Sequence, residues 1–106
     1  MTESVERLLL ELKQGLERLY GARLQGVYLY GSYAREEQDD ESDLDALIIL
    51  DRIGRYGAEI DRTSELVSDL SLRYGTSISR VFVSEEDWLH LNTAFLSNVR
   101  AEAIAV

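Results

Sequence analysis

Two stretches of the chain carry apolar residues at the three- and four-residue spacing of a buried helix face. The first, residues 4 to 20, places leucine or valine at positions 5, 8, 9, 12, 16 and 19 and is followed by Gly21. The second, residues 55 to 74, is followed by Gly75, and its apolar face consists of Tyr56, Ile60, Leu66, Val67 and Leu70. Because glycine commonly follows the last residue of a helix, we predict an amphipathic helix in each stretch.

Three shorter stretches have the composition of strands. Residues 26 to 30 are rich in aromatic and branched side chains, and residues 78 to 83 follow the second helix. Residues 44 to 50 are apolar on both faces apart from Asp45. Such a run predicts a central strand that is covered on both sides.

One last helix is predicted to begin at Ser84, because three acids follow this serine as in a capped first turn. Its apolar face would consist of Trp88, Leu91, Phe95 and Val99. A short helical turn is also expected at residues 32 to 35. The predicted order is therefore α-β-α-β-α-β-α, an α/β fold in which a small mixed sheet is flanked by helices.

The bulk composition narrows the functional classes. A chain of 106 residues suits one domain, which we expect to span residues 1–106. It has no cysteine, no apolar run of membrane-spanning length and no basic leader, so a cytoplasmic protein without membrane contact is expected. The formal charge of −9 disfavours direct nucleic-acid binding but permits a basic partner protein, or a phosphate ligand accompanied by a divalent cation.

The most informative stretch begins at Gly31-Ser32, where the first predicted strand ends. A glycine at this point lets the chain turn sharply and brings backbone N–H groups close to an anion. The start of a helical turn adds a positive dipole end, and Arg35 offers a fork of donors. We predict that Gly31, Ser32 and Arg35 bind phosphate; a plain turn with an exposed arginine is the alternative.

Two acids, Asp43 and Asp45, stand two residues apart at the start of the central strand. The two-residue period of a strand places both carboxylates on the same face, where they suit Mg²⁺ shared with substrate phosphates. For these acids and Gly31-Ser32 to reach one ligand, the first two strands must be antiparallel neighbours.

The spacing of these residues resembles the signature of the DNA-polymerase-beta-like nucleotidyltransferases: Gly31-Ser32, ten residues, then Asp43-x-Asp45. The short chain is similar to the minimal nucleotidyltransferases (MNT), many of which are antitoxins paired with a HEPN toxin. The resemblance implies that Gly31 and Ser32 hold the β and γ phosphates of ATP. It further implies that Asp43 and Asp45 are catalytic and bind two Mg²⁺ ions.

The chain departs from the family pattern at two places. Family members often have glycine after the arginine, where this chain has Glu36. The third acid of the family usually lies on the third strand, where this chain offers only Ser77 or Ser79. An acid from a neighbouring helix, such as Glu85 or Asp69, is another candidate for that role.

The predicted activity is Mg²⁺-dependent transfer of AMP from ATP to a hydroxyl of a partner protein. The resemblance suggests a tyrosine of a HEPN toxin as the acceptor, with the chain as the antitoxin. Two alternatives remain open: an MNT-like antitoxin that neutralises its partner by binding alone, and a small-molecule nucleotidyltransferase that borrows its acceptor site from another subunit. Hetero- and homo-oligomers are both compatible with the sequence.

Overall fold

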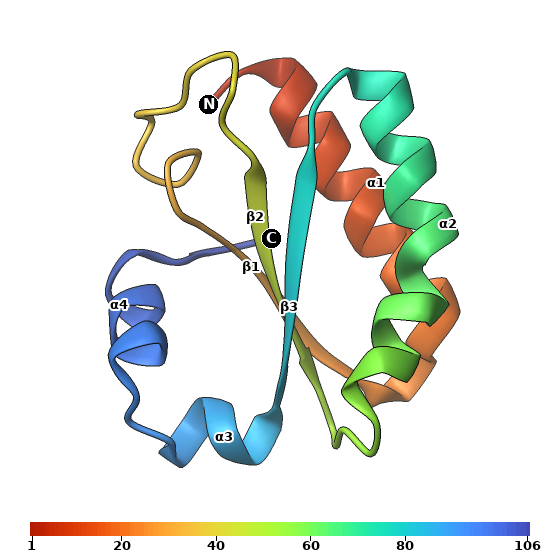
Figure 1. Ribbon diagram of the computed structural model, residues 1–106, viewed down its shortest axis with the longest axis vertical. Helices are drawn as coiled ribbons and strands as arrows, with labels where there is room; N and C mark the ends of the chain where they lie inside the picture. Colours follow the sequence, from red (N-terminus) through yellow and green to blue (C-terminus); the bar gives the residue numbers. More distant parts are fainter.

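The computed structural model describes every residue from Met1 to Val106 and is an α/β fold built around one small sheet (Figure 1). The elements follow in the order α1 (Glu3–Tyr20), the 3-10 helix η1 (Gly21–Arg23), β1 (Leu24–Tyr30), β2 (Leu44–Leu50), α2 (Tyr56–Tyr74), β3 (Ile78–Ser84), α3 (Glu85–His90), α4 (Ala94–Glu102) and β4 (Ile104–Ala105). The two long predicted helices and the three predicted strands are confirmed. None of the helices combines the length and the hydropathy that crossing a membrane requires.

The two helix stops predicted from glycine are also confirmed. Gly21 follows α1 with φ 55°, and Gly75 follows α2 in the left-handed conformation with φ 62°. A side chain at either position would strain the backbone, so glycine ends both helices where the chain must reverse toward the sheet.

The sheet has the strand order β3-β2-β1-β4. Strand β1 pairs antiparallel with β2 and with β4, whereas β2 and β3 are parallel, so the sheet is mixed as predicted. The antiparallel pairing of β1 and β2 confirms the expectation that the end of one strand lies beside the start of the other. Strand β2 is the central strand, and five of its residues form its fully buried stretch from Ala46 to Leu50.

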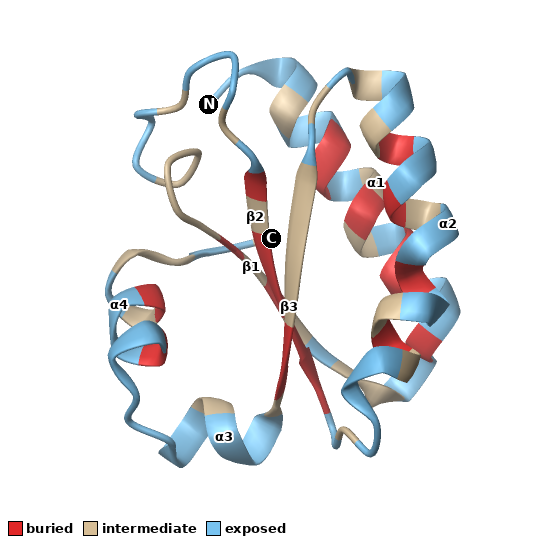
Figure 2. Cartoon of the chain, viewed as in Figure 1, coloured by how far each residue is buried: buried red, intermediate tan, exposed pale blue.

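The two faces of the sheet are covered unequally (Figure 2). Helices α1 and α2 cover one face and enclose the larger core, whose members include Leu8, Leu12, Leu29, Ile48 and Phe82. Helices α3 and α4 lie against the other face over a smaller cluster of Leu47, Ile49, Val83, Leu96 and Val99. Alternation along β2 puts Asp45, two residues before Leu47, on this thinly covered face.

Two local predictions are wrong, and one short strand was not predicted. The single last helix is divided into α3 and α4, because Thr93 caps a new helix by accepting a hydrogen bond from the Leu96 amide at 3.1 Å. Residues 32 to 35 form hydrogen-bonded turns and no helix. The chain also contains the short strand β4, which pairs with Tyr28 and Leu29 of β1. No periodic pattern in the sequence predicted this strand.

Candidate active site

The turn after β1 brings Gly31 against the carboxylate of Asp45. Gly31 has φ 76°, a left-handed conformation that side chains disfavour. A Cβ built on this residue would collide with Oδ2 of Asp45, since Tyr30 and Asp45 are directly paired across β1 and β2. Glycine is therefore required here twice, for the turn and for the close approach of the acid.

The backbone continues from Gly31 through a compact series of turns. The amide of Arg35 donates to the carbonyl of Gly31 at 3.2 Å, and the amide of Glu37 donates to that of Ser32 at 2.9 Å. Between them, Glu36 has φ 56° and is the only non-glycine residue with positive φ. This conformation favours glycine, so Glu36 is held under backbone strain.

A row of side chains crosses the thinly covered face of the sheet at Tyr30, Asp45 and Ser79. Pairing across β1, β2 and β3 aligns these three residues. Burial raises the pKa of Asp45, and the neighbouring carboxylate of Asp43 raises it further. Burial likewise raises the pKa of Tyr30 to about 12, with a contribution from Asp45, so this phenol stays protonated.

Ser79 is the residue that lies beside Asp45 on the neighbouring strand, so it stands closer to the expected place of a third acid than Ser77 does. Neither acid named as a substitute reaches this place. Asp69 lies on α2, across the sheet, where it accepts a hydrogen bond from Arg73. Glu85 follows the far end of β3. No three acidic or other metal-ligating side chains are grouped closely enough to hold a metal by themselves.

The two acids do fit a metal that is shared with a substrate. Asp43 lies directly before β2 and is exposed, whereas Asp45, the second residue of β2, is half-buried. Mg²⁺ is commonly held by one or two carboxylates together with phosphate oxygens, and it needs no cage made only of protein. The missing side chain of Gly31 leaves the carboxylate of Asp45 facing bare backbone.

The structure adds one acid that the sequence did not reveal. Glu102, the last residue of α4, accepts hydrogen bonds from the Gly31 amide at 3.2 Å and from Nη1 of Arg35 at 2.7 Å. Arg35 also donates to Glu37 at 3.3 Å. Hydrogen bonding from Arg35 holds the pKa of Glu102 below its ordinary value, so this carboxylate is charged at neutral pH.

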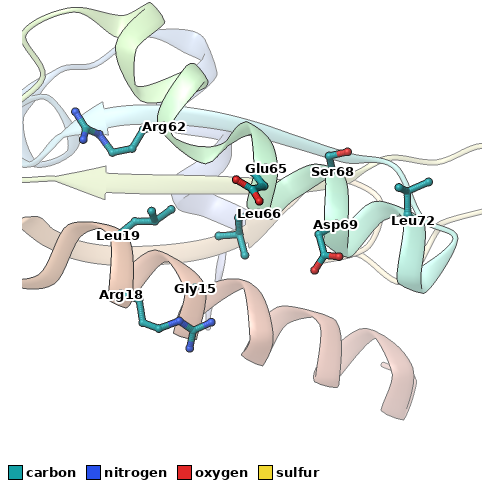
Figure 3. A pocket seen from close by; sticks show the side chains of 9 residues that line it. All are labelled: Gly15, Arg18, Leu19, Arg62, Glu65, Leu66, Ser68, Asp69 and Leu72. Atoms are coloured by element: carbon teal, nitrogen blue, oxygen red, sulfur yellow. The ribbon is translucent and has the colours of Figure 1, made fainter.

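Surface hollows do not by themselves identify this site. The largest, about 680 Å³, lies between α1 and α2 on the opposite side of the sheet (Figure 3). This hollow is lined by side chains of both charges. Gly15 lets α1 and α2 pack closely there, because a Cβ at this position would collide with Leu66. A hollow of about 450 Å³ borders the motif instead and is lined by Tyr33, Ser42 and Ser77 together with the acids of the loop.

Comparison with known proteins supports a single family. A family model for the nucleotidyltransferase domain matches residues 9–93. Two proteins of Methanocaldococcus jannaschii, each named as a putative protein adenylyltransferase, are similar in sequence. One is 34% identical over 98 residues, covering 92% of both chains, and the other is 29% identical over 96 residues, covering 91% of this chain and 92% of the relative.

Solved structures share the fold at lower identity. A toxin–antitoxin crystal structure with AMP-PNP has a TM-score of 0.64 at 20% identity, covering 94% of this chain and 70% of that one. A complex of tri-AMPylated Shewanella oneidensis HEPN toxin with MNT antitoxin has a TM-score of 0.54 at 17% identity, covering 92% and 70%. A nucleotidyltransferase candidate from Sulfolobus solfataricus has a TM-score of 0.58 at 16% identity, covering 99% and 86%.

Proposed function

The chain belongs to the nucleotidyltransferase domain family, and on that premise we propose that it transfers AMP from cytoplasmic ATP to a tyrosine hydroxyl of a HEPN-type toxin, whose antitoxin it is. The observation that carries the proposal is the contact between the Gly31 turn and the Asp45 carboxylate. It joins a backbone suited to phosphate with an acid suited to a divalent cation, across two strands that the sequence separates by a loop.

In this proposal, the bare backbone at Gly31 and Ser32 binds the β and γ phosphates, and Arg35 supplies a charged fork of donors. Asp43 and Asp45 would hold Mg²⁺ against the phosphates. When bound, the metal would neutralise phosphate charge and lower the pKa of the acceptor hydroxyl. The residues thereby position the α-phosphorus and keep the charged phosphates in place, which is most of what phosphoryl-type transfer asks of a protein.

The transfer itself exchanges one phosphorus–oxygen bond for another. The acceptor oxygen attacks the α-phosphorus in line with the leaving group, and its proton is released to water. The bond from the α-phosphorus to the oxygen that bridges to the β-phosphorus breaks, and pyrophosphate departs. Support for a protein acceptor comes from the relatives named as protein adenylyltransferases and from the structural neighbour whose HEPN toxin is AMPylated.

A labelling experiment tests the proposal. The purified chain is incubated with Mg²⁺, ATP labelled at the α-phosphate and the protein encoded by the neighbouring gene, which the proposal expects to be a HEPN-type toxin. We expect label on a tyrosine of that protein, none from ATP labelled at the γ-phosphate, and none when Mg²⁺ is chelated. Absence of label with an active toxin preparation would contradict the enzymatic proposal.

One observation favours a second candidate, an antitoxin that neutralises by contact. Ser79, which has no carboxylate, stands beside Asp45, and the chain carries a net charge of −9 that suits a basic surface. Toxin inhibition by Asp45→Asn protein separates the two. If the Asp45→Asn protein still inhibits the toxin fully, and does so without ATP, neutralisation occurs by contact alone. If the Asp45→Asn protein no longer inhibits the toxin, neutralisation requires catalysis.

A further inference from the structure

The carboxylate of Glu102 lies on the two donors that the proposed function assigns to phosphate. One oxygen accepts from the Gly31 amide at 3.2 Å and the other from the Arg35 guanidinium at 2.7 Å. A backbone amide beside an arginine is a typical pair of ligands for one anion, because both donate charged or polarised N–H groups without offering an acceptor. The nucleotide-free protein therefore already has an anion in this subsite.

The arrangement does not make Glu102 the third metal ligand. Asp43, Asp45 and Glu102 do not come together as a group of three that could hold an ion. Both oxygens of Glu102 are committed to N–H donors, which compete with a cation for the same lone pairs. Its chemistry at this site is that of an anion bound to donors.

We propose that Glu102 determines the affinity of the phosphate site by acting as an internal competitor. A polyphosphate can accept from the Gly31 amide and from the same Nη1 donor of Arg35 only after it displaces the carboxylate, since two anions cannot accept from the same N–H groups. The affinity of every ligand that needs these two donors is thereby lowered. This inference rests on the proposed function, because it takes these two donors as phosphate ligands.

Release of Glu102 does not require the fold to open. Its side chain is a quarter exposed, and it lies at the last position of α4. The segment that follows is anchored by the pairing of β4, by the Val106 amide donating to the Val27 carbonyl at 3.0 Å and by Lys13 donating to the Val106 carbonyl at 2.6 Å. The backbone there can stay in place, because a change of rotamer of the Glu102 side chain is enough to free the subsite.

Glu37 provides a matched control. Like Glu102 it accepts a hydrogen bond from Arg35, at 3.3 Å, but it makes no contact with the Gly31 amide and its side chain is two-thirds exposed. Removing either charge changes the net charge equally. Only removal at position 102 vacates the donor pair.

Calorimetry with inorganic tripolyphosphate in the presence of Mg²⁺ tests the proposal without involving the base or the acceptor. We expect Glu102→Gln to lower Kd about tenfold, Glu102→Ala to lower it at least as much, and Glu37→Gln to change it less than about twofold, from the usual strength of charged hydrogen bonds. We also expect Glu102→Gln to have a lower Tm without ligand. A purely structural role would lower both the Tm and the affinity, so the opposite signs are specific to competition.

Two outcomes overturn the inference and are distinct from each other. If wild-type protein binds tripolyphosphate and Glu102→Gln binds it equally or more weakly, or if Glu37→Gln gains as much, the competitor role is wrong while the proposed function stands. If neither the wild type nor either Glu102 variant binds tripolyphosphate or ATP with Mg²⁺, the phosphate site itself is refuted, and the proposed function fails with it.

Discussion

Glu59 and Asp45 lie on opposite sides of the same sheet, and the fold treats these two carboxylates in opposite ways. Glu59, on α2, is 4% exposed and accepts hydrogen bonds from the Tyr20 hydroxyl at 2.9 Å and from Arg62 at 3.1 Å. Arg23 adds an ion pair at 3.7 Å. Although burial alone would raise it, these partners hold the pKa of Glu59 below its ordinary value.

Asp45 has no such partners. Burial and the charge of Asp43 raise its pKa. Arg35 is the cation that opposes this shift, but it donates its hydrogen bonds to Glu102 and Glu37 instead. One carboxylate thus stabilises the fold, while the other lacks partners at some expense of stability. The difference teaches that the covered face of the sheet supplies stability, whereas the thinly covered face carries the unpaired acid on which the proposed site rests.

Replacing Asp45 should have the largest effect, because it should lower the rate of AMP transfer while raising the thermal stability of the protein. We expect Asp45→Asn to reduce AMP transfer by about 100- to 1,000-fold, the usual loss when a charge-stabilising group is removed. The same change should raise the Tm in EDTA, because a half-buried charge is removed. Ser32→Ala is the comparison, with a smaller loss of transfer because the backbone N–H groups remain. Single-turnover kinetics measure the transfer rate, and thermal melts measure the Tm. A lower Tm for Asp45→Asn than for the wild type would contradict the contrast with Glu59.

Replacing Glu59 should be the reverse case, with a large loss of stability and no direct loss of chemistry. We expect Glu59→Ala to lower the free energy of unfolding by about 3 kcal/mol, since it leaves the buried Tyr20 hydroxyl and Arg62 without their acceptor and removes the ion pair with Arg23. Urea denaturation measures this, with Asp69→Ala on the exposed side of the same helix as the control. Equal effects of the two changes would show that the Glu59 network is not special.

The two carboxylates should also give opposite pH dependences of stability. The pKa of Glu59 is lowered in the fold, so its contribution is present above the unfolded value of about 4.3 and is lost as pH falls through the folded value. The pKa of Asp45 is raised, so stability linked to it is lost as pH rises through the folded value. In a plot of the free energy of unfolding against pH, Glu59→Gln should therefore reduce the loss of stability at acidic pH. Asp45→Asn should remove the loss of stability that occurs as pH rises through the folded pKa of Asp45.

Placing an acid beside Asp45 should raise the rate of AMP transfer moderately. The pairing of β2 and β3 selects Ser79 for this change. A well-positioned base contributes on the order of 100-fold or more, and we expect Ser79→Asp to gain part of that, roughly tenfold in transfer rate. Ser77→Asp is the matched comparison and should gain less. A slower Ser79→Asp enzyme would show that added like charge outweighs an added base.

The smallest expected effect concerns strain in the phosphate-binding turn. Glu36→Gly should raise the Tm by a few degrees, because it removes the positive-φ penalty and costs only an exposed ion pair with the N-terminal ammonium. Glu37→Gly, at a residue without positive φ, should lower the Tm slightly. Differential scanning calorimetry compares the two, and equal shifts would argue against strain at position 36.

Much of the fold could be predicted because its signals are short-range. Helices α1 and α2 follow from apolar spacing and from Gly21 and Gly75, and β2 follows from an uninterrupted apolar run. The division between α3 and α4 had a local signal as well, Thr93 in a capping position, but the continuing apolar period concealed it. The glycine and the two acids of the site could be found because strand alternation and antiparallel pairing constrain where they lie.

The sequence by itself determined the helices, the three main strands and the meeting of Gly31 with Asp45, since each depends on spacing within one or two neighbouring elements. Only the tertiary structure decided that Glu102 reaches the Gly31 amide from 71 positions away and that Ser79 rather than Ser77 faces Asp45. The reason is physical: the docking of α4 is set by the packing of its Leu96 and Val99 against the sheet, and the register of β3 is set by its pairing with β2. No periodicity within either segment encodes which residue of another segment it will meet.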